Sequence, residues 1–362
     1  MSTKPRIYLD FNATAPLVQV ARTAMHEALA DPGGNPSSIH AEGRAARDRI
    51  ERARDQVAAL VHRPREQVVF TSGGTEANLL GIHALATVAE ARGLPKLVVT
   101  TPLEHPSLLG AVRALAARGW TIVYSRAPLD VTPGLVAAAW VNHELGALVA
   151  PPLAAWGRAA GALVHVDAVQ AIGKIPGGIE ADAVALSAHK LGGPQGTGAL
   201  VSEHDVAVTD GGHQERGRRA GTENAIGIVG FGAAASALEV TAWPAVAALG
   251  DAFEVGLVAL GGVTIHGAGM PRAGGTINAG FAGARGESIV IALDLAGIAA
   301  STGSACTSGS VQPSAVLLGL GLAAGDARSA VRFSLGRTTT RDELDRTLAV
   351  LADILPRVRR HS

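Results

Sequence analysis

Short apolar runs recur along the chain, and segments of helical length separate most of them. The runs are continuous rather than alternating, which is typical of strands buried on both faces of a parallel sheet. Strands that alternate with helices indicate an α/β fold with helices on both faces of the sheet. We therefore predict a large domain with a mainly parallel, seven-stranded sheet, whose strands are residues 67–71, 96–101, 121–124, 137–141, 163–166, 183–186 and 199–201.

A smaller α+β domain is predicted after this sheet. A long helical pattern runs from Asn224 to about residue 260 and is interrupted at Trp243 and Pro244. Strand patterns then lie at 275–281, 298–301 and 330–335, and helix patterns lie at 287–295, 314–320 and 341–355. The predicted domain bounds are 15–243 for the large domain, and 1–14 with 244–362 for the small domain.

The composition indicates a well-packed globular protein. Hydrophobic residues make up 48% of the 362 residues and charged residues 17%, so the chain can bury a large core. The formal net charge is +0, so nucleic acid is not an expected partner. Apolar stretches are too short to span a bilayer, and the N-terminus lacks the apolar core of a signal peptide. We therefore expect a cytoplasmic protein that does not bind membranes.

Polar residues gather at the predicted carboxyl ends of the strands, which is where parallel sheets bind ligands. These positions are residues 72–75, Glu104 with His105, Asn142 with His143, Asp167, and Lys190. Because the carboxyl ends of parallel strands meet at one edge of a sheet, a ligand site is predicted there.

Lys190 follows Ser187 and His189 at the end of one apolar strand. A lysine is poorly suited to a strand end unless it is bonded to something. An enzyme that uses pyridoxal phosphate needs this arrangement, because the lysine amine forms a Schiff base and the serine hydroxyl can meet the cofactor phosphate. The alternative interpretation is a lysine in a surface loop.

Two further positions suit the same cofactor. The run from Thr71 to Glu76 places glycines between a strand and a helix, where backbone N–H groups can bind a phosphate. The alternative is an ordinary glycine turn. Asp167 ends a buried strand, so it either pairs with a cation such as a protonated pyridine nitrogen or caps a helix.

His105 and Cys306 are candidates for proton and sulfur chemistry. His105 can stack on an aromatic ring and move protons near neutral pH, or it can be an ordinary histidine at a helix start. Cys306 is the only cysteine, so it makes no internal disulfide. A lone cysteine is often a small buried hydrophobe. However, residues 301–310 carry no bulky or charged side chain and indicate a loop on which a thiol is free to react.

Taken together, these stretches resemble the cysteine desulfurases of the NifS/IscS type, within the class V aminotransferase family of pyridoxal phosphate enzymes (fold type I). The resemblance covers nearly the whole chain in order. The matching stretches are YLDFNATAP at 8–16, GNPSSIHAEGR at 34–44, VVFTSGGTEANLLGI at 68–82, EHPS at 104–107, HVDAVQAIGK at 165–174, SAHK at 187–190, QERGRRAGTEN at 214–224, residues 286–322, and VRFSLGR at 331–337.

The resemblance implies how the cofactor would be held. Lys190 would form the Schiff base, and His105 would stack on the ring. Asp167 would pair with the pyridine nitrogen, and Gln170 would reach the ring hydroxyl. The residues that hold the phosphate would be Gly74, Thr75, Ser187 and His189.

Two implied contacts concern positions outside this set. Thr222 would reach the phosphate of the neighbouring subunit, which implies a homodimer. Motif register places His143 where the family has an asparagine that meets the ring hydroxyl. A register shift of one residue would give this role to Asn142 instead, and both interpretations stay open.

The resemblance also implies the reaction. Asn35 and Arg337 would bind the carboxylate of L-cysteine, although an arginine at a strand end can also form a surface ion pair. Cys306 would accept the substrate sulfur as a persulfide, and alanine would leave. The sulfur would then pass to an acceptor protein for iron–sulfur clusters, thio-cofactors or tRNA.

Three other functions remain open at this point. A selenocysteine lyase would use the same pocket. Another class V aminotransferase would have no use for the segment around Cys306. An inactive relative that serves as a binding partner would be expected to lose Lys190 or Asp167, and both are present. No metal site is predicted.

Overall fold

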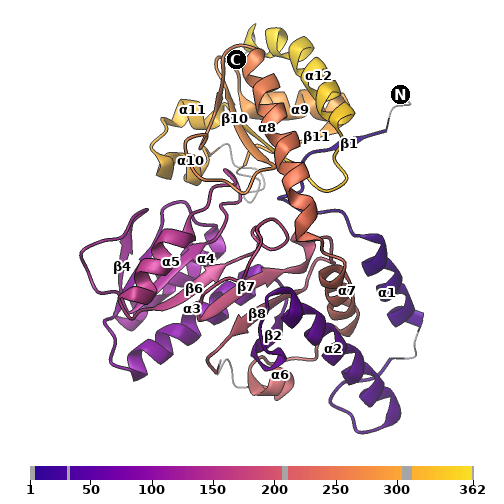
Figure 1. The fold of residues 1–362 in the computed structure, drawn as a ribbon, viewed down its shortest axis with the longest axis vertical. Coiled ribbons are helices and arrows are strands. Elements are labelled where there is room, and N and C mark those ends of the chain that lie inside the picture. Colours follow the sequence, from indigo (N-terminus) through magenta and orange to yellow (C-terminus); the bar gives the residue numbers. More distant parts are fainter. Residues whose placement is uncertain (1–4, 31–32, 206–210, 304–311, 361–362) are drawn as a thin grey trace. The chain divides into compact units, whose positions relative to one another are not determined.

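The computed structural model describes residues 5–30, 33–205, 211–303 and 312–360 (Figure 1). The chain divides into two compact units. The larger unit consists of Ala15–Val141 and Val149–Glu239, and the smaller unit consists of Met1–Thr14, Asn142–Leu148 and Val240–Ser362.

The short segment Asn142–Leu148 differs from the sequence prediction, which places it in the large domain. In the structure it belongs to the smaller unit. Ala147 forms a β-bridge with Arg272, and the Leu148 N–H donates to the carbonyl oxygen of Pro271 at 2.8 Å. These partners lie far away in the chain, so local pattern gave no sign of the pairing.

The larger unit contains the mainly parallel, seven-stranded sheet that the sequence predicts, in the order β2-β8-β7-β6-β5-β3-β4. Only β8 runs antiparallel to its neighbours in this sheet. The strands are β2 (Val68–Thr71), β3 (Leu97–Thr100), β4 (Thr121–Tyr124), β5 (Leu135–Ala139), β6 (Leu163–Asp167), β7 (Ala183–Ser187) and β8 (Gly198–Ser202). Strand β5 begins two residues earlier than predicted, because its pairing with β6 starts at Leu135.

Helices cover both faces of this sheet (Figure 1). The α-helices are α1 (Gln19–Ala30), α2 (Ala41–Leu60), α3 (Gly74–Ala91), α4 (Pro106–Ala114), α5 (Ala150–Ala159), α6 (Gln214–Gly217) and α7 (Ala225–Ser236). Short 3-10 helices are η1 (Arg65–Gln67), η2 (Leu115–Arg118) and η3 (Ala188–Lys190). Leu135 and Leu163 share a buried cluster with α3 and α4. The next residues along these strands, Val136 and Val164, lie against Gly157 of α5. Alternation along each strand thus buries both faces of the sheet.

The smaller unit has a three-stranded antiparallel sheet in which β10 (Thr276–Phe281) lies between β9 (Val263–Ile265) and β12 (Ala330–Ser334). A two-stranded parallel pair joins β1 (Ile7–Tyr8) to β11 (Ile298–Ala299). The helices are η4 (Val240–Ala242), α8 (Trp243–Ala259), α9 (Gly286–Leu295), α10 (Ala315–Leu320), α11 (Ala324–Arg328) and α12 (Arg341–Arg360). Strand β9 has no counterpart among the sequence predictions.

Helix α8 corrects two expectations. Trp243 and Pro244 begin the helix rather than interrupt one, because a proline in the first turn lacks only an N–H that has no helical partner. The segment Val240–Ala259 is also long and apolar enough to cross a membrane by length and composition, contrary to the sequence expectation. Its buried side chains, including Phe253 and Leu257, pack in the hydrophobic core of the smaller unit.

Candidate functional site

The predicted residues of the larger unit lie at the carboxyl ends of β6 and β7. Asp167 is the last residue of β6, and Ser187 is the last residue of its neighbour β7. Lys190 ends η3, which follows directly. Gly74 begins α3 against the same edge, because a Cβ atom there would lie 2.7 Å from Val169 Cγ2 and 3.5 Å from Ser187 Cβ. The topology therefore brings an amine, a carboxylate and a helix N-terminus to one place.

Two hydrogen bonds fix the carboxylate of Asp167, which is 7% exposed. Its Oδ2 accepts from Asn78 Nδ2 at 2.7 Å, and its Oδ1 accepts from the Val169 N–H at 3.0 Å. Each oxygen keeps a further lone pair. The carboxylate can therefore receive a cation without giving up either bond.

Asn78, whose side chain donates to Asp167, belongs to a buried polar network. His165 and Asp167 lie on the same face of β6, because side chains alternate along a strand, and α3 covers this face. Asn78, on the buried side of α3, also bonds to His165 Nε2 at 2.9 Å and to Ser107 Oγ at 3.0 Å. Ser107 Oγ lies 2.8 Å from His105 Nδ1. The network thus joins Asp167 to His105 through two side chains.

Sequence reasoning assigned no role to Asn78, Ser107 or His165. A signal was present for Asn78, since a polar residue on the buried side of an apolar helix needs hydrogen-bond partners. The identity of those partners depends on the packing of α3 against β6 and α4, which the sequence does not give.

His105 is the N-cap of α4, with Nδ1 accepting from the Ser107 N–H at 3.1 Å. Burial lowers the pKa of its imidazole, the Asp167 charge opposes this shift, and the Lys190 charge adds to it. His105 therefore lies close to both charged groups. It also begins a helix, as one sequence interpretation has it, and its stacking and proton roles stay predictions.

Glu104 is a second buried carboxyl group in this region and is 3% exposed. Thr101 Oγ1 lies 2.6 Å from its Oε1, and the Ala139 N–H donates to its Oε2 at 2.7 Å. Burial raises the pKa of Glu104 to about 8; these hydrogen bonds oppose the shift and the Asp167 charge adds to it. Glu104 is therefore mostly uncharged at neutral pH.

The start of α3 has the geometry of an anion site. Gly73 is its N-cap with φ of 156°, a region open to glycine, and a Cβ atom there would meet nothing within 4 Å. Glu76 anchors the loop, because its carboxylate accepts from the Ser72 N–H at 2.6 Å and from Arg219 Nε at 3.1 Å. Thr75, in the first turn, is exposed. There is thus room beside Gly73 at the start of α3, where the first N–H groups of a helix have no helical partner.

Two other predicted cofactor residues flank the same edge. Burial, helped by the Lys190 charge, lowers the pKa of His189 to about 4, so this imidazole is neutral at pH 7. Gln170 is 5% exposed, and its Oε1 accepts from Lys174 Nζ at 2.9 Å. Gln170 follows the end of β6 by three residues, and His189 follows the end of β7 by two, so both residues lie close to these strand ends.

Thr222 is exposed on the segment 214–224. Glu215 anchors this segment through a buried ion pair with Arg54, at 2.6 and 2.8 Å, and accepts from the Phe70 N–H at 2.8 Å. Glu215 and Arg216 both have a left-handed backbone, which is strained for residues with side chains. The buried ion pair therefore holds a strained turn beside the edge strand β2.

Four other predicted site residues are divided between the two units: Asn35 belongs to the larger unit, and Asn142, His143 and Arg337 belong to the smaller unit. Asn35, exposed in the larger unit, forms a local turn in which its Oδ1 accepts from the Ser37 N–H at 2.9 Å. Arg337 is exposed in the smaller unit. Asn142 is 1% exposed there, and its Oδ1 accepts two backbone N–H groups at 2.9 Å each. The next residue, His143, is partly exposed, with Nε2 3.6 Å from Glu144 Oε1.

Cys306 lies outside the described residues. The described residues on either side of its segment both meet the buried side chain of Glu144. Ser314 Oγ donates to Glu144 Oε2 at 2.6 Å and also caps α10. Gly303 has φ of 77°, and a Cβ atom there would lie 2.6 Å from the same Oε2. Burial raises the pKa of Glu144, and its Ser314 hydrogen bond and the Arg332 charge oppose this shift.

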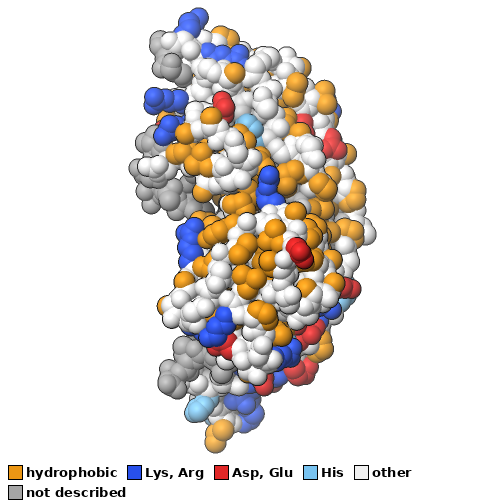
Figure 2. Space-filling view, turned by 90° about the vertical axis from the view of Figure 1, so that its left-hand side faces the viewer, with side chains coloured by type: hydrophobic (Ala, Val, Ile, Leu, Met, Phe, Trp, Pro, Cys, Tyr) orange, Lys and Arg blue, Asp and Glu red, His pale blue; other side chains and the backbone are white. Residues whose placement is uncertain are grey.

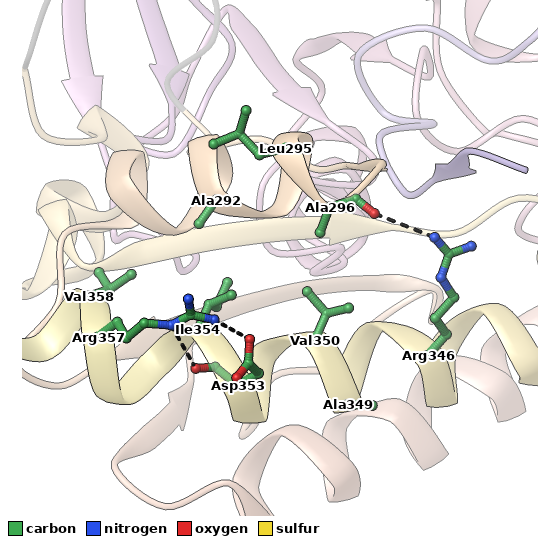
Figure 3. Close-up of a pocket in the computed structure, with 10 residues that line it drawn as sticks. All are labelled: Ala292, Leu295, Ala296, Arg346, Ala349, Val350, Asp353, Ile354, Arg357 and Val358. Carbon is green, nitrogen blue, oxygen red and sulfur yellow. Dashed lines mark hydrogen bonds and ion pairs between the residues drawn. The ribbon is translucent and has the colours of Figure 1, made fainter. Parts of the chain in front are cut away.

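A groove of about 800 Å³ lies between α9 and α12 in the smaller unit (Figure 3). Apolar side chains such as Leu295 and Val350 line it, and its charged side chains are engaged: Arg357 pairs with Asp353, and Arg346 donates to the Ala296 carbonyl at 3.4 Å. None of the predicted site residues lines this groove. It is therefore separate from the candidate chemistry.

Figure 2 shows how charged side chains are distributed over one face of the described residues. Acidic and basic side chains are scattered there among hydrophobic ones. This mixture agrees with the formal net charge of +0.

Comparisons with known proteins extend over nearly the whole chain. The family model for aminotransferase class V matches residues 7–347. A cysteine desulfurase of Enterobacter agglomerans is 38% identical over 379 residues, covering 98% of this chain and 93% of the relative. A solved structure described as a NifS-like protein has a TM-score of 0.87 at 29% identity, covering 97% of this chain and 99% of that one. The structure of SspA in complex with cysteine has a TM-score of 0.77 at 26% identity, covering 92% and 100%.

Proposed function

Because the chain belongs to the class V aminotransferase family and is a cysteine desulfurase, we propose that it converts L-cysteine to L-alanine with pyridoxal 5'-phosphate as its cofactor. Sulfur transfer is the activity of this enzyme class. One observation carries the proposal: Lys190, the fixed carboxylate of Asp167 and the glycine start of α3 converge at one edge of the sheet.

The residues at this edge fit the cofactor. The open N-terminus of α3, with Gly74 and Thr75, suits the phosphate, and Ser187 and His189 flank it. Asp167 has a lone pair for a protonated pyridine nitrogen. When bound, pyridoxal phosphate withdraws electrons from the α-carbon of an amino acid.

The proposed proton chemistry belongs to Lys190 and His105. Lys190 would hold the cofactor covalently, and its amine would take the α-proton of the substrate. Burial keeps the pKa of His105 below its usual value, so its imidazole is neutral near pH 7, and we assign to it the handling of the thiol proton. His105 would also stack on the ring of the bound cofactor.

The proposed sulfur acceptor is Cys306. Its thiolate attacks the sulfur of L-cysteine, an S–S bond forms, and the C–S bond breaks. The electron pair of that bond stays with the carbon skeleton, which takes up a proton and leaves as alanine. An ordinary thiol has a pKa near ~8.5, so the attack needs a nearby base or a lowered thiol pKa.

We assign the substrate carboxylate to Asn35 and Arg337. His143 is the proposed partner of the ring hydroxyl together with Gln170, because motif register places it where the family has an asparagine in that role. The structure of SspA in complex with cysteine supports the choice of substrate class.

The proposed assembly is a cytoplasmic homodimer. Thr222 of each subunit reaches the phosphate bound by the other, which suits its exposure on an anchored turn. An acceptor protein then takes the sulfur from Cys306 for iron–sulfur clusters or for other thio-cofactors and tRNA.

The test is a product assay on the purified protein. L-cysteine is added with a reductant, and alanine and sulfide are both measured. Equal amounts of the two, from protein with visible cofactor absorbance, are expected. Absorbance without either product would overturn the choice of L-cysteine as substrate, and His143 would then be examined first.

Two variants separate the roles of cofactor and thiol. Lys190→Ala is expected to lose the absorbance of the attached cofactor and turnover together. Cys306→Ser is expected to keep the absorbance and to lose sulfide release. Full activity in Cys306→Ser would refute the persulfide step.

A further inference from the structure

The hydrogen bonds around Asn78 have a direction that chemistry fixes. An ionised carboxylate only accepts, so the Asn78 amide nitrogen must face Asp167 Oδ2, as it does at 2.7 Å. The amide oxygen then faces His165 Nε2 at 2.9 Å, and this nitrogen must carry the hydrogen.

The surroundings of His165 agree with this tautomer. Its side chain is fully buried, and burial lowers its pKa to about 3, so the ring is neutral. Its Nδ1 has no hydrogen-bond partner among the described residues and lies against Gly81. A bare ring nitrogen suits such a place, whereas an N–H without a partner does not.

The direction continues from Asn78 to His105. The second amide hydrogen of Asn78 points to Ser107 Oγ at 3.0 Å, so this hydroxyl accepts there and turns its own hydrogen to His105 Nδ1 at 2.8 Å. The backbone N–H of Ser107 donates to the same Nδ1 at 3.1 Å. A proton on Nδ1 would therefore face two donors.

We propose that Asn78, acting through Ser107, is a positioning residue that keeps His105 Nδ1 as an acceptor, so that the neutral ring of His105 carries its proton at Nε2. The use of that proton in sulfur transfer rests on the proposed function. The tautomer itself does not, because it follows from hydrogen bonds within the larger unit. Asn78 at the same time holds Asp167 Oδ2, so one carboxamide aligns both groups.

The direct test observes the ring nitrogens. Full-length protein is labelled with ¹⁵N-histidine, and His105 is identified by the signal lost in His105→Gln. At neutral pH the long-range ¹H–¹⁵N pattern should show a neutral ring with hydrogen on Nε2. A hydrogen on Nδ1 would refute the proposal.

Three variants test whether Asn78 acts on His105 through Ser107. Asp167 and Lys190 are the charged groups whose fields reach His105, and Ser107→Ala alters neither. Removing one of the two donors should make Nδ1 easier to protonate, so the NMR titration of His105 should move to higher pH. Ser107→Thr keeps the hydroxyl and should restore the wild-type titration. Asn78→Leu should shift the titration in the same direction as Ser107→Ala.

Steady-state kinetics test the same variants for an effect on turnover. Asn78→Leu should lower kcat by up to about 10²-fold with a smaller change in KM, as expected for a misplaced reacting group. Its pH–rate profile should shift with the titration of His105. Unchanged tautomer, titration and profile in both Asn78→Leu and Ser107→Ala would show that the network is merely structural. If the protein released no sulfide but kept the tautomer, only the proposed function would fail.

Discussion

At the scale of single residues, Glu104 and Asp167 show how surroundings separate two similar groups. Asp167 keeps its carboxylate at the edge of the sheet, with donors on both oxygens. Glu104 is buried behind it, and its raised pKa of about 8 leaves it uncharged at pH 7. A neutral Glu104 adds no negative charge beside Asp167. The proposed cation site therefore has one carboxylate rather than two competing ones.

Glu104 should make the stability of the fold depend on pH. Its folded-state pKa lies above the usual 4.5, so the contribution is fully present below about pH 4.5 and is lost as pH rises through 8. The free energy of unfolding of the wild type should therefore fall by on the order of a few kcal/mol between pH 5 and 8. Its melting temperature should fall over the same pH range. Glu104→Gln keeps the shape and a donor for Thr101, and should flatten this fall. Thermal melts at several pH values measure it.

A matched control is Glu180→Gln, because the side chain of Glu180 is 85% exposed. Its melts should follow the wild-type dependence on pH. Parallel curves for wild type and Glu104→Gln would show that the carboxyl of Glu104 is ionised in the folded protein at neutral pH.

At the scale of elements, the contact of α3 with β6 decides the site. The buried side of α3 presents Asn78 and Gly81 to the strand that carries His165 and Asp167. Gly81 has no side chain, so the His165 ring fills the space beside it. This close approach brings the Asn78 carboxamide within hydrogen-bond distance of both strand residues.

Gly81→Ala should therefore be destabilising. A Cβ atom at this position would lie 2.7 Å from His165 Cε1 and Nδ1, and 2.9 Å from Leu200 Cδ1. Overpacking of this kind costs about 1–3 kcal/mol, measurable by urea denaturation. The hydrogen bond between His165 and Asn78 should weaken with it.

Gly110→Ala is the control for this change. Gly110 lies inside α4 in the same unit, and a Cβ atom there would meet nothing within 4 Å. Alanine should stabilise that helix by up to about 1 kcal/mol. Equal effects of the two substitutions would show that α3 does not pack tightly on β6.

At the scale of the whole molecule, the proposed homodimer places part of each site on the other subunit. Thr222 is exposed on the segment 214–224, whose strained turn at Glu215 and Arg216 is held by the buried pair of Arg54 and Glu215. A strained turn that is so firmly anchored suits a contact with a partner. The prediction at this scale concerns which subunit supplies Thr222.

Mixed dimers answer this question. Lys190→Ala and Thr222→Ala are each expected to have low activity alone. When the two chains are unfolded and refolded together, about half of the dimers should be mixed, and each mixed dimer should contain one intact site. Activity should then return to about a quarter of the wild-type value. No recovery, with mixed dimers detected by mass, would mean that Thr222 acts within its own subunit.

The sequence alone determined the seven-stranded sheet and the residues at its carboxyl edge, because buried strands and helix starts leave local patterns of apolar residues and glycines. It also determined the family, since its motifs keep their order along the chain. Local pattern did not reveal three features: the placement of segment 142–148, the strand β9 and the start of α8 at Trp243. They depend on contacts with distant parts of the chain.

Tertiary structure alone decided the polar contacts behind the site. Asn78 and Ser107 are 29 residues apart, and Arg54 and Glu215 are 161 apart. Periodicity reports which side of an element is buried, but not which group it meets there. The neutral state of Glu104 likewise depends on burial by distant chain segments, and a hydrogen-bond direction exists only once both partners are in place.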